Sequence, residues 1–282
     1  MEKYGIVIDS TVYLSKEVVQ QMDARVVSLN VVSGTTSYKE TEVNNDFIFD
    51  LQDKGHQLTT SQPAPGEFLK TYEEMLEKGY EKIFVVTLSA NISGTYQSAN
   101  LAKNMLEDPS KVHIFDTMLC AFGNEMITVE LNEMIKNKNS IKEIEDRITK
   151  LIESSNQMFT VENLFSLTKG GRLSKTRAAI GTVLRVKPII RVVDGKLSLV
   201  NSERTYKKVH QYFLDNIKET TKGYNKISFY VTNTNSLESA KVLEELLKSE
   251  FPNSKIIFTS VLGPVFSIHI GKKGYGLSWF AE

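Results

Sequence analysis

The segment that most constrains the fold is the run Ile83-Phe-Val-Val86, together with the turn that follows it. The run is short, unbroken and rich in β-branched residues, which predicts a strand buried on both faces, as in parallel sheets. Ser89, Ser93 and Thr95 then stand around Gly94, just before a helical pattern. Hydroxyls beside the free N–H groups of a first helical turn favour a small anion such as a carboxylate or phosphate. The alternative is that Ser93 and Thr95 only cap the helix.

A second stretch of similar design spans residues 58–68. A short extended segment ends there in Thr60 and Ser61, and Pro65 is well placed for the first turn of the next helix. If the two strands are neighbours, both hydroxyl-lined turns converge on one ligand. The pair of turns therefore favours an anion site more strongly than either turn alone.

Strands alternate with helices through the first half of the chain, which predicts a three-layer α/β/α domain with a mostly parallel sheet over residues 1–155. In such sheets, ligands bind beyond the carboxyl ends of the strands. The polar stretches expected at that edge are 9–11, 59–61 and 89–95. Asp9 there either orients the hydroxyls or caps a helix.

The pattern changes after residue 155, and residues 156–282 predict an α+β domain with a mixed sheet. Two extended runs joined by Asp194-Gly195 predict a hairpin over residues 187–200. The tail, residues 263–280, is interpreted as two strands with a glycine-rich connection, with His269 in the first of them.

Composition excludes several classes of protein. The 34 basic and 34 acidic side chains cancel, so the chain lacks the overall positive charge of a nucleic-acid-binding protein. The one cysteine, Cys120, cannot form an internal disulfide. The start of the chain leads into a strand, and no apolar run has the length of a membrane span, so we expect a cytoplasmic protein.

One basic run interrupts this neutral composition. Seven cationic residues and no acidic ones occur between 169 and 193: Lys169, Arg172, Lys175, Arg177, Arg185, Lys187 and Arg191. A solvated basic helix is one interpretation of the run. The other is a surface that faces a phosphate or a partner protein.

The candidate catalytic residues do not form a familiar set. The neighbours of His56, His113 and His210 indicate structural or surface roles, whereas glycines around His269 permit a ligand to approach. Ser93 is not in a Gly-x-Ser-x-Gly turn, and a Ser93/His269 pair has no obvious third member. Phosphate-loop, dinucleotide and metal-ligand spacings are absent from the sequence, which favours binding over catalysis.

Five blocks in order along the chain resemble the DegV family of fatty-acid-binding proteins, which includes the binding subunits of bacterial fatty acid kinase. They are Thr60-Ser-Gln-Pro63, Ile92-Ser-Gly-Thr-Tyr96, Lys169-Gly-Gly-Arg-Leu-Ser174, Lys187-Pro-Ile189 and the block from Gly263-Pro-Val to His269. The sequence departs from the usual family pattern at Ala64 and at Gly271-Lys-Lys-Gly274.

The resemblance implies two domains with a long-chain fatty acid between them and no other cofactor. It implies that Thr60 and Ser93 bind the carboxylate, with Ser61, Gly94 and Thr95 around it and His269 in the same hydrogen-bonded network. It also implies that Arg172 lies near the mouth of the site, and with Lys175 it is our candidate surface for a partner or a phosphate.

The sequence therefore leads to one hypothesis and two alternatives. The protein binds a fatty acid and presents its carboxylate to a separate ATP-dependent kinase, which forms the acyl phosphate. The first alternative is an acyl-transfer or hydrolytic enzyme that uses Ser93 and His269. The second is a regulator that binds nucleic acid through residues 169–191.

Overall fold

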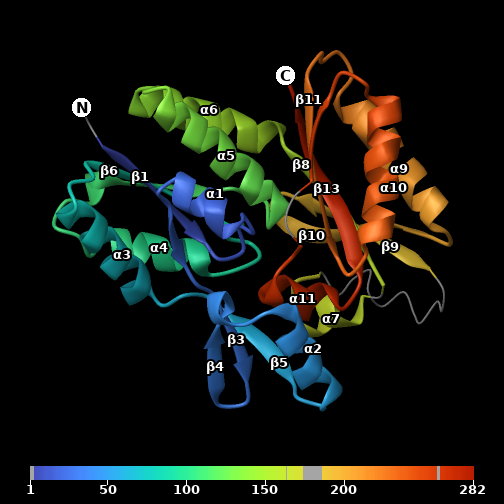
Figure 1. Ribbon diagram of the computed structural model, residues 1–282, viewed down its shortest axis with the longest axis horizontal. Coiled ribbons are helices and arrows are strands. Elements are labelled where there is room, and N and C mark those ends of the chain that lie inside the picture. Colours follow the sequence, from blue (N-terminus) through green and yellow to red (C-terminus); the bar gives the residue numbers. More distant parts are fainter. Residues whose placement is uncertain (1–2, 163, 174–185, 259–260) are drawn as a thin grey trace.

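The computed structural model describes residues 3–162, 164–173, 186–258 and 261–282 (Figure 1). Its strands are β1 (Tyr4–Asp9), β2 (Arg25–Val27), β3 (Asn30–Ser33), β4 (Thr36–Lys39), β5 (Leu58–Ser61), β6 (Lys82–Thr87), β7 (Val112–Asp116), β8 (Asn156–Val161), β9 (Lys187–Val193), β10 (Lys196–Glu203), β11 (Ile227–Thr234), β12 (Lys255–Phe258) and β13 (Gly274–Ala281).

Its α-helices are α1 (Lys16–Gln21), α2 (Asn45–Asp53), α3 (Pro65–Glu77), α4 (Thr95–Lys103), α5 (Phe122–Lys136), α6 (Ile141–Ser154), α7 (Phe165–Lys169), α9 (Tyr206–Thr220), α10 (Leu237–Glu250) and α11 (Pro264–Ile270). Two 3₁₀ turns, η1 (Glu40–Glu42) and η2 (Pro109–Lys111), complete the described elements. Within these described residues, no helix is long and apolar enough to cross a membrane.

The first sheet is parallel and has the strand order β2-β1-β6-β7. The chain moves outward from β1 to β2 on one side and from β6 to β7 on the other, so the order reverses between β1 and β6. Such a switch point leaves a crevice at the carboxyl ends of the two central strands. The loops that follow β1 and β6 are therefore the natural place for a ligand.

Helices cover both faces of this sheet, which confirms the predicted α/β architecture (Figure 1). Helices α3 and α4 pack on one face, whereas α5 and α6 pack on the other. The ends of α6 follow from local signals, since Ser140 and Glu143 form a capping box and Ile144, Ile148 and Leu151 are buried one helical turn apart.

The second large sheet is mixed, with the order β10-β9-β8-β13-β11-β12, and only β11 and β12 run parallel among its described pairs. Helices α9 and α10 cover its outer face, and α5 and α6 lie between it and the parallel sheet (Figure 1). The predicted hairpin is confirmed: β9 and β10 are antiparallel, with positive φ at Asp194 and Gly195. The division into domains at residue 155 stays a prediction.

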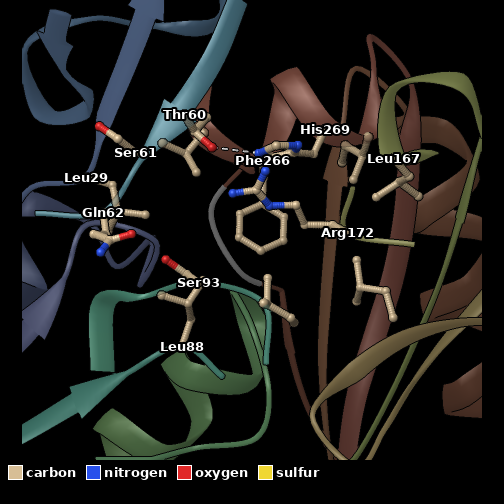
Figure 2. Close-up of a pocket in the computed structure, with 14 residues that line it drawn as sticks. Leu29, Thr60, Ser61, Gln62, Leu88, Ser93, Leu167, Arg172, Phe266 and His269 are labelled. Carbon is tan, nitrogen blue, oxygen red and sulfur yellow. Dashed lines mark hydrogen bonds between the residues drawn. The ribbon is translucent and has the colours of Figure 1, made fainter. Parts of the chain in front are cut away.

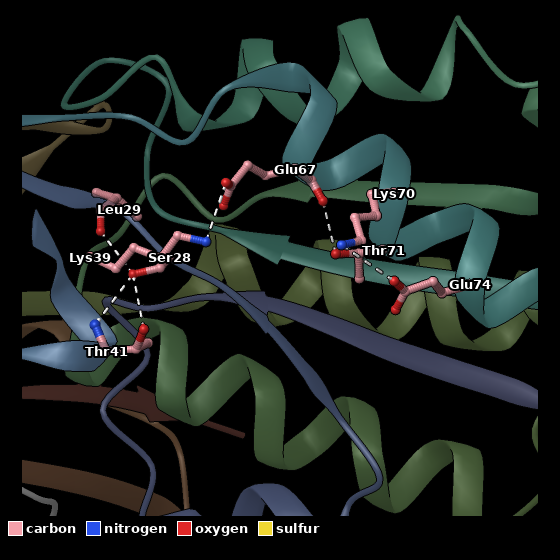
Figure 3. A network of polar contacts seen from close by, with 8 residues as sticks. All are labelled: Ser28, Leu29, Lys39, Thr41, Glu67, Lys70, Thr71 and Glu74. Atoms are coloured by element: carbon pink, nitrogen blue, oxygen red, sulfur yellow. Dashed lines mark hydrogen bonds and ion pairs between the residues drawn. The ribbon is translucent and has the colours of Figure 1, made fainter. Parts of the chain in front are cut away.

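The extended run of residues 25–32 in the sequence predicts one strand, and this prediction is wrong, because the run forms β2 and β3. Only β2 belongs to the parallel sheet, whereas β3 pairs with β4 and β5 in a separate antiparallel sheet. The chain bends at Ser28, whose hydroxyl donates to the Leu29 carbonyl oxygen at 2.8 Å. Figure 3 shows this bend and the ion pair between Lys39 and Glu67, 3.3 Å apart, that ties β4 to α3.

The small sheet also changes the expected place of Thr60. Strand β5 pairs antiparallel with β3, so residues 59–61 do not lie on the carboxyl edge of the parallel sheet. Only the stretches after β1 and β6 share that edge. The two hydroxyl-bearing turns therefore meet across the pocket from different sheets.

The prediction of two strands over residues 263–280 is also wrong, because residues 264–270 form helix α11 and only β13 is a strand. Pro264 occupies a first-turn position, which proline favours. Nearly every residue of the helix is buried, including Val265, Phe266, Ile268 and Ile270. A helix buried all round has no polar face, so its sequence lacks the 3.6-residue periodicity that identifies helices.

Candidate functional site

A pocket lies among the parallel sheet, the small sheet and the mixed sheet, with about 470 Å³ of empty space that includes its open mouth (Figure 2). Most of its lining is apolar, and its polar side chains come from β5 and the residue after it, the β6–α4 loop, α11 and the segment after α7. The lining residues are Leu29, Thr60, Ser61, Gln62, Leu88, Ile92, Ser93, Leu167, Arg172, Leu197, Val265, Phe266, His269 and Ile270.

Thr60 and His269 are joined across this pocket. The Thr60 Oγ1 atom lies 2.8 Å from His269 Nε2, although the two residues are 209 positions apart (Figure 2). Burial, with a smaller contribution from the positive charge of Arg172, lowers the pKa of His269 to about 4. The imidazole is therefore neutral at neutral pH. Its buried Nδ1 atom has no hydrogen-bond partner among the described residues.

Ser93 lies just before the N-terminus of helix α4. Its Oγ atom is 2.9 Å from Thr95 Oγ1 and accepts a hydrogen bond from the Thr95 backbone N–H at 3.3 Å. The N-cap residue of α4 is Gly94, which has no side chain to cap with. A Cβ atom at Gly94 would lie 2.6 Å from the amide of Gln62, so the glycine permits close packing there. Thr95 thus holds the Ser93 hydroxyl, and neither Gly94 nor Thr95 lines the pocket.

Asp9 connects the carboxyl ends of β1 and β6. One carboxylate oxygen accepts from the Thr11 N–H at 2.9 Å and from its hydroxyl at 2.5 Å, and the other accepts from the Leu88 N–H at 2.7 Å. Burial raises the pKa of Asp9, and these hydrogen bonds oppose the shift. Because Leu88 lines the pocket, the contacts favour the interpretation that Asp9 orients this loop.

The hairpin turn closes the pocket from the other sheet. Ser89 Oγ donates to the Gly195 carbonyl oxygen at 2.7 Å, and Asn91 Nδ2 donates to the Asp194 carbonyl oxygen at 3.0 Å. Leu197 follows this turn and contributes to the pocket wall. The β6–α4 loop is therefore held by both large sheets.

Arg172 brings a positive charge to the polar end. Its side chain extends toward His269 and the Thr60 hydroxyl in Figure 2. Its guanidinium donates to the Gly170 carbonyl oxygen at 2.6 Å, and burial lowers its pKa. No carboxylate among the described residues forms an ion pair with it. Arg172 thus lines the pocket itself rather than only its mouth.

A second, outer groove lies on the other side of Arg172 and His269 and shares both residues with the pocket. Lys169 lies in this groove and donates to the side chain of Gln57 at 2.6 Å. Lys175, predicted to act with Arg172, lies outside the described residues. The imidazole and the guanidinium therefore stand between an inner and an outer space.

The described members of the basic run do not form one patch. Lys187 lies over the ring of Tyr206, 4.8 Å from its centroid, whereas Arg191 donates to the side chain of Asn156 at 2.7 Å. These two cations have structural partners in the mixed sheet and its helices. Among the members of the run that the structure describes, Lys169 and Arg172 face the site.

The structure thus brings together Thr60, Ser61, Ser93, Arg172 and His269 at one pocket. Ser61 follows Thr60 on β5, and its hydroxyl points away from the Thr60–His269 pair (Figure 2). Among the described residues, no hydrogen bond joins Ser93 to His269, and no group of three or more acidic, histidine or cysteine side chains could hold a metal ion.

Sequence reasoning did not identify the apolar lining, chiefly Leu29, Leu197, Val265 and Phe266, or the amide of Gln62. Gln62 is part of the Thr60–Pro63 block, and its place beside Thr60 is the signal that could have identified it. The apolar residues carry no such signal, because pocket and core side chains have the same composition.

The protein has an α/β fold with a mostly apolar pocket between its sheets, and hydroxyls and a guanidinium lie at one end of that pocket. These features define a class of protein that is suited to hold a small amphipathic anion. Comparison with known proteins then identifies the family: the DegV family model matches residues 3–282, and the chain belongs to this family.

Three of its relatives match over 98–100% of their own lengths. A DegV domain-containing protein of Listeria innocua is 33% identical over 280 residues, with 99% of this chain and 98% of the relative covered. A DegV family protein from Thermus thermophilus, described as binding fatty acid, superposes with a TM-score of 0.92 at 28% identity and covers 99% of this chain and 100% of its own. DegV of Bacillus subtilis, described as a fatty acid binding protein, has a TM-score of 0.87 at 28% identity, with both chains fully covered.

Proposed function

We propose that this protein binds a long-chain fatty acid, with the carboxylate at Thr60 and Ser93 and the acyl chain among the apolar residues of the pocket. The observation that carries the proposal is the Thr60–His269 hydrogen bond, 2.8 Å long, beside Arg172 in a pocket whose lining is mostly apolar. The descriptions of the Thermus thermophilus and Bacillus subtilis relatives as fatty-acid-binding proteins support it.

The neutral imidazole has a specific part in this proposal. If His269 Nε2–H donates to Thr60 Oγ1, the Thr60 hydroxyl proton is free to donate to a carboxylate oxygen. Ser93 supplies a second hydroxyl, and Arg172 supplies the compensating charge. A hydrogen bond to a charged group contributes about 1.5–3 kcal/mol.

The acyl chain contributes more in total. Burial of each methylene contributes about 0.8 kcal/mol before the cost of ordering the chain. We therefore expect the tail to set the affinity and the polar end to set the orientation, with the two domains, 1–155 and 156–282, enclosing the ligand.

We further propose that the bound carboxylate is presented to a separate kinase in the cytoplasm, which transfers a phosphoryl group from ATP to a carboxylate oxygen. The outer groove supports this step, because it approaches Arg172 and His269 from solvent and carries Lys169 at its rim. The chain itself would then need no catalytic residue and no further cofactor. A charge reversal, Lys169→Glu, should lower acyl phosphate formation by the kinase, trapped with hydroxylamine, without lowering fatty acid content.

The acyl-transfer alternative has less support. Ser93 Oγ contacts Thr95 instead of His269, and an imidazole with a pKa of about 4 is a weak general base at neutral pH. The alternative predicts that the isolated protein hydrolyses an acyl ester, whereas the binding proposal predicts no turnover.

Native mass spectrometry with lipid extraction tests the binding proposal. We expect a stoichiometric fatty acid in protein purified from cells and its loss in the Thr60→Ala/Ser93→Ala double variant. Ser37→Ala, an exposed hydroxyl on β4, is the matched control and should keep the ligand. An empty wild-type protein that also fails to take up added palmitate would contradict the proposal.

A further inference from the structure

Glu40 is an acidic side chain buried beside the pocket, with 4% of its surface exposed. Three donors point at its carboxylate. Ser10 Oγ donates at 2.5 Å to one oxygen, and the Tyr13 hydroxyl and the Val265 backbone N–H each donate at 2.8 Å to the other. The donors come from the loop after β1 and from the first turn of α11, so the carboxylate joins parts of the chain about 225 positions apart.

These contacts reach the wall of the pocket. The Ser10 hydroxyl accepts from the Leu29 N–H at 2.9 Å, and the Glu40 N–H donates to the Leu29 carbonyl oxygen at 2.9 Å. The ring of Tyr13 packs edge-on against Phe266, with centroids 6.0 Å apart. Leu29, Val265 and Phe266 all line the pocket, so one carboxylate supports three of its walls.

Val265 also connects Glu40 to the polar end. Residues four apart in a helix lie on the same face, and His269 follows Val265 by four positions on α11. A helix of seven residues has little stability of its own and depends on tertiary contacts. Asn45 of α2 supplies another anchor, because its side chain bonds to the Leu262 carbonyl oxygen and to the Ser267 hydroxyl. Of these two anchors, Glu40 contacts the first turn of the helix.

We propose that Glu40 is a positioning residue for the ligand site: by accepting the Val265 N–H it holds α11 so that His269 meets Thr60. The proposal rests on the fatty acid function inferred above. The residue acts through the helix and the pocket wall, since Glu40 itself does not line the pocket.

Three substitutions separate this role from general stability. Glu40→Ala removes every contact, and Glu40→Asp keeps the charge but withdraws the carboxylate from Val265. Glu40→Gln keeps the length and an oxygen that can accept the Val265 N–H. Glu42→Ala, an exposed acid in the same 3₁₀ turn, is the matched control.

The experiment measures palmitate affinity by calorimetry and the ring ¹⁵N signals of His269, identified with a His269→Asn variant. We expect Glu40→Ala and Glu40→Asp to weaken binding by about tenfold and to shift the His269 signals in the ligand-free protein, while Glu40→Gln restores both toward wild type. If the Glu40→Ala variant does not fold, the Glu40→Asp variant tests the positioning role instead.

Wild-type affinity together with unshifted His269 signals in the folded Glu40 variants would overturn the positioning role. Failure of the wild-type protein to bind palmitate would instead overturn the proposed function. In that case the ring signals still report whether Glu40 positions α11, so the two failures are distinguishable.

Discussion

Asp9 and Glu40 are both buried carboxylates behind the pocket, but they support it in different ways. Asp9 bonds to backbone and hydroxyl groups of two neighbouring strand ends, which the parallel ladder already holds together. Glu40 bonds to groups of a short helix that has no strand ladder to hold it. Loss of Asp9 should therefore cost mainly stability, whereas loss of Glu40 should cost mainly ligand affinity.

The largest expected effect is on folding stability at Asp9. Asp9→Ala leaves the Leu88 N–H and the Thr11 donors unpaired in the core, and we expect the free energy of unfolding to fall by about 2–4 kcal/mol. Denaturant titration measures the change. Asp108→Ala, an exposed acid with similar local bonds to Ser110, should lose less than about 1 kcal/mol. Equal losses of unfolding free energy in Asp9→Ala and Asp108→Ala would show that burial does not make Asp9 more important for stability.

The next effect is a pH dependence at Glu40. Burial raises its pKa from 4.5 to about 7 in the folded protein, opposed by the Ser10, Val265 and Tyr13 hydrogen bonds and assisted by the charge of Asp9. Between pH 4.5 and 7 the folded state therefore binds more protons than the unfolded state, so the free energy of unfolding falls as pH rises.

Glu40→Gln removes the titrating group. The free energy of unfolding of this variant, relative to that of the wild type, should therefore rise by roughly 2–3 kcal/mol from pH 5 to pH 8. Burial also raises the pKa of Glu125, to about 8. Its effect on the free energy of unfolding is the same in both proteins and cancels when the two are compared. A difference that stays flat with pH, measured by denaturant titration, would show that Glu40 keeps one charge state.

A smaller effect is expected at the polar end. A Cβ atom at Gly170 would lie 2.6 Å from His269 Nδ1, so Gly170→Ala should move the imidazole away from Thr60. We expect about tenfold weaker palmitate binding, the cost of one hydrogen bond to a charged group. Calorimetry measures it, and Gly66→Ala on α3, where a Cβ meets nothing within 4 Å, is the control. Unchanged affinity would exclude His269 from the carboxylate network.

The smallest effect is expected at Ser61. Its hydroxyl points away from the Thr60–His269 pair, so Ser61→Ala should change palmitate affinity by less than about threefold, whereas Thr60→Ala should reduce it by about tenfold or more. This pair of neighbours on β5 tests the predicted ligand role of Ser61. A large loss in Ser61→Ala would mean that the ligand approaches β5 from the opposite face.

Prediction from sequence succeeded where local pattern and local structure agree. The buried strand at 83–86 and the Asp194-Gly195 turn both depend on neighbours within a few residues. Prediction failed for α11, whose buried apolar run carries no helical period, and at Ser28, where a hydroxyl and a distant strand pairing turn the chain into another sheet.

The candidate site divides in the same way. Thr60, Ser93, Arg172 and His269 could be found from the sequence because they are polar residues in distinctive blocks, whose resemblance to the DegV family marked them. Leu197, Val265 and Phe266 could not, since an apolar side chain has the same character in a pocket as in a core.

The sequence by itself determined the α/β architecture, because this depends on periodicity and turn chemistry. Its resemblance to the DegV family pointed to Thr60, Ser93, Arg172 and His269 at the candidate site. Only the tertiary structure decided that His269 bonds to Thr60 instead of Ser93, that Arg172 lines the pocket, and that Glu40 supports the helix between them. These contacts join segments up to 225 positions apart, and their geometry follows from how three sheets pack together, which no local pattern specifies.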